Sequence, residues 1–146
     1  MRCIDPVTGG VQSSWNGDVP TGTVWEKSND PSPAGWRVPT ADEIEKLCDT
    51  NKVTNVWTTQ NGVTGRKFTD KATGVSIFLP AVGSRDPNYG TLLNVGSGGF
   101  YWSSTQLDIG RAYHLNFCVD GVSGCDASLW RQMRGFGSSV RPVAAN

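Results

Sequence analysis

The sequence predicts an α+β fold with short antiparallel strands, one clear helix and long irregular loops. Three observations support this fold class. Short segments rich in β-branched and aromatic residues follow one another along most of the chain, with turn residues between them. Residues 41–49 repeat their apolar positions at helical spacing. Glycine (18 residues) and proline (8 residues) are abundant for 146 residues, which is typical of a loop-rich domain.

The helix has the clearest local signal. Thr40 and Glu43 have the spacing of a capping box, in which each side chain accepts a hydrogen bond from the backbone N–H of the other residue. Ile44 and Leu47 then fall on one helical face, with charged residues outside. This pattern predicts a scaffold helix of about nine residues that begins at Ala41.

The remaining elements are expected to be strands. Residues 53–60 and 63–70 predict a hairpin, because the Asn61-Gly62 pair between them is a strong turn signal. Residues 81–99 are rich in Gly, Pro and Asn and are expected to form a long loop. Further strands are expected at residues 75–80 (a buried strand), 100–105, 112–119 and 138–144.

The strand expected at residues 112–119 alternates between two faces. We interpret one face as the core side, formed by Tyr113, Leu115, Phe117 and Val119. The other face is expected to meet solvent or a partner, and it carries Ala112, His114, Asn116 and Cys118.

Length and composition limit the class of protein. A chain of 146 residues favours a single domain over residues 1–146 with its own core. Its zero net charge argues against binding to nucleic acid or to an anionic membrane. No apolar run approaches the roughly 20 residues of a membrane span, and the first residues lack the apolar core of a secretion signal. Low charge and six tryptophans are more typical of an extracellular module than of a cytosolic enzyme.

The residues suited to metal binding or catalysis are few. The four cysteines lack the CxxC spacing of a structural zinc site. Cys118 and Cys125 would close a short loop in an oxidising compartment, and free thiols are the alternative. His114 is the single histidine, so no site with several histidine ligands can be assembled. The Asp86-Pro87-Asn88 triplet is the nearest to a calcium-dependent sugar site, and it is more typical of a turn.

Several motifs together resemble one family. They cover the chain from about Asn29 to Val143 and are NDPSPAGWRVPTADEIEKL, GRKFTD, TGVSIFLPAVGSRD, YWSSTQ, AYHLNF and SVRPV. The chain resembles bacterial domains of the Fibrobacter succinogenes major paralogous domain type, which have a C-type lectin-like fold and are related in fold to formylglycine-generating enzymes. Within that group it is most similar to variable proteins of diversity-generating retroelements, whose reverse transcriptase rewrites the C-terminal gene segment at adenines.

The resemblance implies a constant scaffold that carries a diversified ligand-binding segment at residues 101–134. Template repeats of this type are rich in Asn codons, whose adenine changes give neither Lys nor Glu, and both are absent from Phe100 onward. The scaffold positions implied include Tyr101, Trp102, Ser103, Ser104, Thr105, Tyr113, Leu115, Phe117 and Arg134. The ligand-binding positions implied are Leu107, Asp108, Ile109, Arg111, His114, Asn116, Cys118, Asp120, Ser123, Cys125, Asp126, Ala127, Ser128, Leu129, Trp130 and Arg131.

Binding is therefore expected rather than catalysis. The related enzymes use an active-site cysteine pair with copper, whereas Cys118 and Cys125 lie in the segment implied to be variable, so no metal and no cofactor is expected. Burial in the core is the alternative for Leu129, Trp130 and Met133. We expect an adhesin or receptor-binding element for a protein or glycan on another cell or host surface, without nucleic acid. It would lie on a cell surface (pilus tip or lipoprotein) or on a phage or virus particle. The alternative is an undiversified carbohydrate-binding or structural module of a surface lipoprotein.

Overall fold

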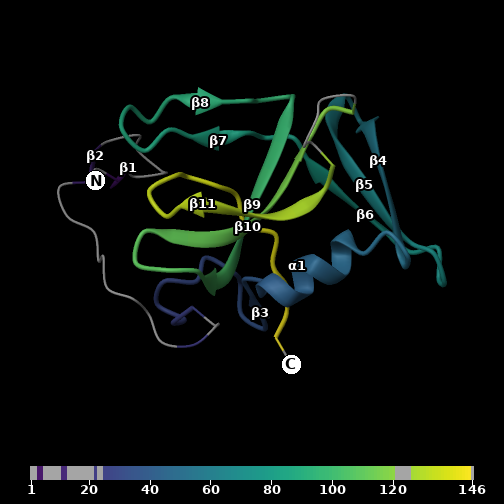
Figure 1. The fold of residues 1–146 in the computed structure, drawn as a ribbon, viewed down its shortest axis with the longest axis horizontal. Helices are drawn as coiled ribbons and strands as arrows, with labels where there is room; N and C mark the ends of the chain where they lie inside the picture. The colour runs from purple at the N-terminus through teal and green to yellow at the C-terminus, as the bar shows by residue number, and fades with distance from the viewer. Residues whose placement is uncertain (1–2, 5–10, 13–21, 23–24, 121–125, 146) are drawn as a thin grey trace.

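The computed structural model describes residues 3–4, 11–12, 22, 25–120 and 126–145. These residues form mostly antiparallel strands with one short helix, which confirms the α+β class (Figure 1). Two three-stranded sheets have the strand orders β4-β5-β6 and β11-β10-β9, and the described part adds the two-stranded pairs β1-β2, β3-β12 and β7-β8. The bounds of the two-stranded pairs are Cys3–Ile4 (β1), Val11–Gln12 (β2), Trp36–Arg37 (β3), Val143–Ala144 (β12), Ser84–Arg85 (β7) and Leu92–Leu93 (β8).

The predicted helix is confirmed as α1 (Ala41–Cys48), together with its capping box. The Thr40 side chain accepts a hydrogen bond from the Glu43 N–H at 3.3 Å, and the Glu43 carboxylate accepts one from the Thr40 N–H at 2.8 Å. The same carboxylate accepts two hydrogen bonds from Arg37 of β3, at 2.7 and 2.8 Å. These Arg37 bonds lower the pKa of Glu43 to about 2. The cap therefore also fixes the start of the helix to β3.

The first sheet is formed by β4 (Val53–Gln60), β5 (Val63–Asp70) and β6 (Ser76–Pro80). The predicted hairpin is confirmed, because Gln60 pairs with Val63 across a two-residue turn. Asn61 and Gly62 have φ values of 49° and 79°, the left-handed conformation that such a turn requires at both positions. The expectation that β6 is a buried strand is wrong, since only Leu79 in it is buried. β6 lies at one side of the sheet, which leaves its other residues partly open to solvent.

The second sheet contains β9 (Gly98–Gln106), β10 (Arg111–Cys118) and β11 (Ser128–Met133). β9 and β10 confirm the two strands expected in this region within about two residues. β11 was not expected, because its sequence SLWRQM contains no β-branched residue. The long loop expected at 81–99 contains the short strands β7 and β8, and the strand expected at 138–144 is reduced to β12.

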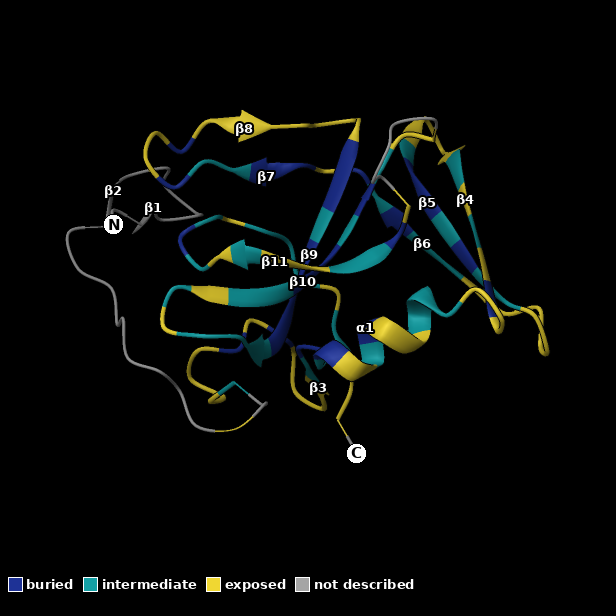
Figure 2. Ribbon diagram, in the orientation of Figure 1, coloured by how far each residue is buried: buried dark blue, intermediate teal, exposed yellow. Residues whose placement is uncertain are grey.

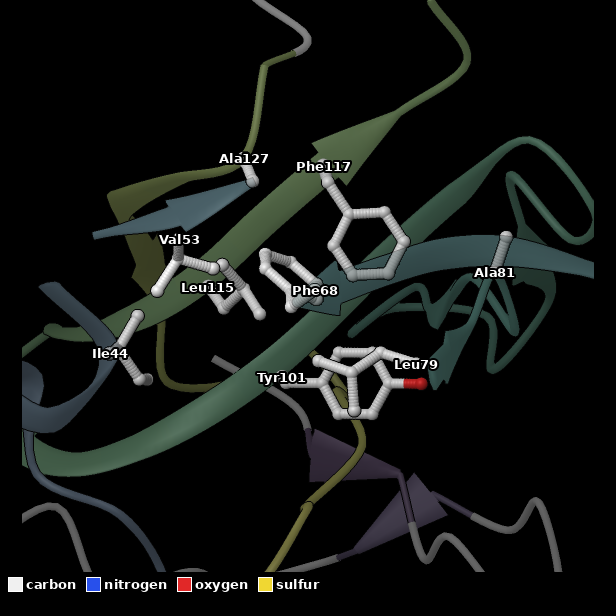
Figure 3. Packing of buried hydrophobic residues seen from close by; sticks show 9 residues of the cluster. All are labelled: Ile44, Val53, Phe68, Leu79, Ala81, Tyr101, Leu115, Phe117 and Ala127. Carbon is white, nitrogen blue, oxygen red and sulfur yellow. The ribbon is translucent and has the colours of Figure 1, made fainter. Parts of the chain in front are cut away.

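The hydrophobic core lies between the two sheets and α1 (Figure 3). Phe117 of β10 is fully buried, and the rings of Trp57, Phe68 and Tyr101 surround it at centroid distances of 6.4, 6.1 and 6.0 Å. Gly99 of β9 pairs with Phe117, and a Cβ atom at Gly99 would lie 2.0 Å from the Phe117 ring. Glycine is therefore required at this crossing of side chain and backbone. The buried cluster contains Ile44, Val53, Phe68, Leu79, Ala81, Tyr101, Leu115, Phe117 and Ala127.

Candidate ligand-binding surface

Strand pairing brings the expected ligand-binding residues together around β10 and β11. β10 lies between β9 and β11, and α1 packs against all three strands from the core side. Arg111 of β10 pairs with Met133 of β11, and His114 pairs with Trp130. Because paired residues in antiparallel strands project to the same face, each pair places its side chains next to each other.

The turn at residues 107–110 is bonded to itself and to the end of β11. The Asp108 carboxylate accepts hydrogen bonds from the backbone N–H groups of Gly110 (2.9 Å) and Arg111 (2.8 Å), and it forms an ion pair with the Arg111 side chain (2.6 Å). The hydrogen bond from Arg111 lowers the pKa of Asp108. Arg134, just after β11, donates to the carbonyl oxygens of Ile109 (3.1 Å) and Gly110 (2.9 Å). Asp108 is thus engaged within the turn, and Ile109 is held against β11.

Five side chains in this region are exposed, and we call them the β11 surface: Ile109, Arg111, Trp130, Arg131 and Met133. The exposed fractions of the three apolar residues are 68% for Ile109, 61% for Trp130 and 42% for Met133. The residues lie on the strand β11, on its pairing partner in β10 and in the turn bonded to its end. Trp130 and Met133 project to opposite sides of β11, so the surface extends around this strand. Large exposed apolar side chains on an outer strand and on the turn bonded to it make this region the candidate interaction site.

His114 is the main correction to the expected binding face, because only 1% of it is exposed. Its ring stacks on Phe100 (6.0 Å between centroids) and lies 5.7 Å from the ring of Trp102. Neither ring nitrogen has a hydrogen-bond partner among the described residues, and burial lowers the pKa of His114 to about 4. The outer face of the central strand β10 is covered here, so His114 is a neutral part of the packing.

Several other residues are more buried or more exposed than the sequence led us to expect. Ala127 is buried in the core cluster and is not available to a ligand, and the half-buried Leu129 packs against that cluster. On the face expected to be core, Val119 is 38% exposed and Tyr113 is only half-buried. Asp120 and Asp126 are exposed, and the half-buried positions are Leu107, Asp108, Asn116, Cys118 and Ser128. Cys118 is disulfide-bonded, whereas the expected positions Ser123 and Cys125 lie outside the described residues.

Arg66 of β5 is a residue near this region that sequence reasoning missed. Its side chain is 2% exposed and donates to Asn55 Oδ1 (2.5 Å) and to the carbonyl oxygen of Cys118 (3.0 Å). It also pairs with the Asp120 carboxylate. Arg66 therefore attaches the end of β10 to the first sheet. The sequence contained one sign that Arg66 is buried, because Arg66 and Phe68 project to the same face of their strand. A buried guanidinium requires hydrogen-bond or charged partners.

The comparisons with known proteins add no relative. No protein-family model matches the chain, and neither curated proteins nor solved structures give a match. The resemblance described from the motifs therefore stays a prediction. Within the described residues, no helix has the length and apolar character of a membrane span. The same residues contain no group of three or more His, Cys, Asp or Glu side chains placed to hold a metal ion.

Proposed function

We propose that the protein is a ligand-binding display protein with a C-type lectin-like fold, in which a retroelement has diversified the β11 surface. The observation that carries this proposal is the exposure of Ile109, Trp130 and Met133 on a hydrogen-bonded part of the second sheet. The exposure of large apolar side chains to water is unfavourable, so the binding of a partner that covers them lowers the free energy. The motif residues support the same assignment, because Tyr101, Trp102, Leu115 and Phe117 are buried, as scaffold positions should be.

Recognition by this surface would be non-covalent. Trp130 and Arg131 are adjacent on β11, and Trp and Arg are the residues most often found as anchors in protein interfaces. Arg111 adds a second exposed guanidinium, although its ion pair with Asp108 reduces its charge toward a ligand. Since pairing with β10 and the Arg134 bonds already fix the backbone, binding would cost little ordering entropy. We propose a protein or glycan on another cell or host surface as the partner.

This function places the protein where it meets other surfaces. An adhesin or receptor-binding element would be carried on a cell surface, as a pilus-tip protein or a lipoprotein, or on a phage or virus particle. The zero net charge of the sequence makes nucleic acid an unsuitable partner. The proposal does not include catalysis.

Sequencing the gene and its surroundings tests the retroelement origin. We expect an imperfect second copy of the DNA that encodes residues 101–143, next to a reverse-transcriptase gene, with differences only where the copy has adenine. Between alleles, changes should gather at the codons for Ile109, Arg111 and Arg131 and spare those for Leu115 and Phe117. Differences spread over all four bases would reject diversification and favour the undiversified surface-lipoprotein module.

A further inference from the structure

An apolar cavity of about 160 Å³ is lined by residues of the core, α1, β6 and β12, and none of its lining residues belongs to the β11 surface. Its floor is formed by core residues that are almost fully buried, namely Ile44, Leu79 and Leu115. Its rim is formed by half-buried residues from α1, β6 and β12, namely Leu47, Ile77 and Val143. Figure 3 shows Ile44, Leu79, Tyr101 and Leu115 among the residues of the buried core. Most of the lining residues belong to α1 and to strands, whereas Pro39 and Arg141 lie outside the regular elements.

Apart from Arg141, the walls offer almost no free polar group to a ligand or to water. The Tyr101 hydroxyl donates to the Pro80 carbonyl oxygen at 2.6 Å, so its ring rather than its oxygen faces the cavity. The Glu43 carboxylate, also on the wall, is engaged by Arg37 and by the Thr40 N–H. An apolar cavity of roughly 150 Å³ stays dry and accepts a molecule the size of benzene. The cavity in this protein has a similar volume and an apolar lining, but it is open to the surface on one side.

Arg141 gives the cavity its charge. It lines the cavity, it is exposed, and it has no hydrogen bond or ion pair with any other described residue. It lies close enough to Tyr101 to oppose the effect of burial, which raises the pKa of Tyr101 to about 12. Glu43 does not neutralise Arg141, because both carboxylate oxygens of Glu43 are bonded to Arg37. An unpaired guanidinium beside an apolar cavity is complementary to an anion with an apolar body.

We propose that this cavity binds a small organic carboxylate with a benzene-sized apolar body. The apolar body fills the space between α1, β6 and β12, and the carboxylate pairs with Arg141. The site is separate from the β11 surface, so this inference does not depend on the proposed function, and either one can fail without the other.

Binding of phenylacetate, with 3-phenylpropionate as a longer probe, tests the proposal on the full chain by NMR titration. We expect saturable shifts of the methyl signals of Ile44, Ile77 and Val143, and intermolecular NOEs between these methyl groups and the ring protons. Phenylacetamide, which has the same shape without the charge, should bind about threefold to tenfold more weakly. Shifts confined to other residues, or equal affinity for the acid and the amide, would overturn the proposal.

Three variants separate the contribution of the cavity from that of the charge. Arg141→Gln should weaken phenylacetate binding about threefold to tenfold and leave phenylacetamide unchanged, whereas Arg131→Gln, which removes a charge from the β11 surface, should change neither. Leu47→Trp should fill the cavity and abolish binding of both probes. If Leu47→Trp does not fold, the NOEs in the unmodified protein decide the question. Undiminished binding to Arg141→Gln, or to folded Leu47→Trp, would contradict the assignment.

Discussion

At the scale of the residue, His114 makes the stability of the protein depend on pH. Its pKa is about 4 in the folded protein and 6.5 normally, so the unfolded chain binds more protons between these values. Stability therefore falls as pH decreases from about 6.5 to about 4, by an amount on the order of 3 kcal/mol, and this loss is complete below the folded pKa.

His114→Leu should remove this part of the pH dependence. Chemical denaturation of both proteins between pH 4 and 7 measures it, with the difference between the two curves as the readout. Carboxylates such as Glu43, whose lowered pKa also reduces stability in acid, are present in both proteins. Their effect is therefore removed when one curve is subtracted from the other. Parallel curves would show that His114 titrates normally and is accessible to solvent.

Phe117 and Trp130 provide a second comparison between single residues. Phe117→Ala should cost about 3–5 kcal/mol, because the side chain is fully buried among three rings. Trp130→Ala should change the free energy of unfolding by less than about 0.5 kcal/mol, because 61% of Trp130 is exposed. Urea denaturation measures both variants. A large loss for Trp130→Ala would mean that Trp130 belongs to the scaffold and would weaken the proposed binding surface.

At the scale of the element, the end of β10 depends on Arg66. Asp120→Ala should destabilise the protein by about 1–2 kcal/mol, because the buried guanidinium loses its carboxylate partner and keeps only Asn55 and the Cys118 carbonyl. Asp126→Ala removes an exposed carboxylate from the same connection and serves as the matched control, with an expected effect below about 0.5 kcal/mol. Equal effects of the two substitutions would show that Arg66 does not hold this end of the strand.

Elements with local signals could be predicted from the sequence, and elements that depend on distant partners could not. The helix α1 and the β4–β5 hairpin are encoded by adjacent residues, the capping box at Thr40 and the turn at Asn61. β11 has no such signal, and its extended form comes from pairing with β10. β7 and β8 are two residues long and are likewise held by pairing, inside a segment whose composition is typical of a loop.

At the scale of the whole molecule, alternation along a strand separates two faces but does not say whether one of them is covered. The rule correctly placed Leu115 and Phe117 inside, because this face of β10 meets the core. It placed His114 outside, because the sequence does not reveal that the rings of Phe100 and Trp102 from β9 pack against His114. Figure 2 shows that most of β9 is buried. Ile109 is exposed because it lies in a turn, and Trp130 is exposed because it lies on the outer strand β11. The outer position of β11 was known only from the structure.

The division between buried scaffold and exposed β11 surface is the central claim, and saturation mutagenesis of residues 101–134 measures it directly. A library displayed on cells and sorted for resistance to protease reports which side chains each position tolerates. We predict broad tolerance at Ile109, Arg111, Trp130 and Arg131, and narrow tolerance at His114, Leu115 and Phe117. Narrow tolerance at the exposed positions, or broad tolerance at His114 and Phe117, would contradict the account.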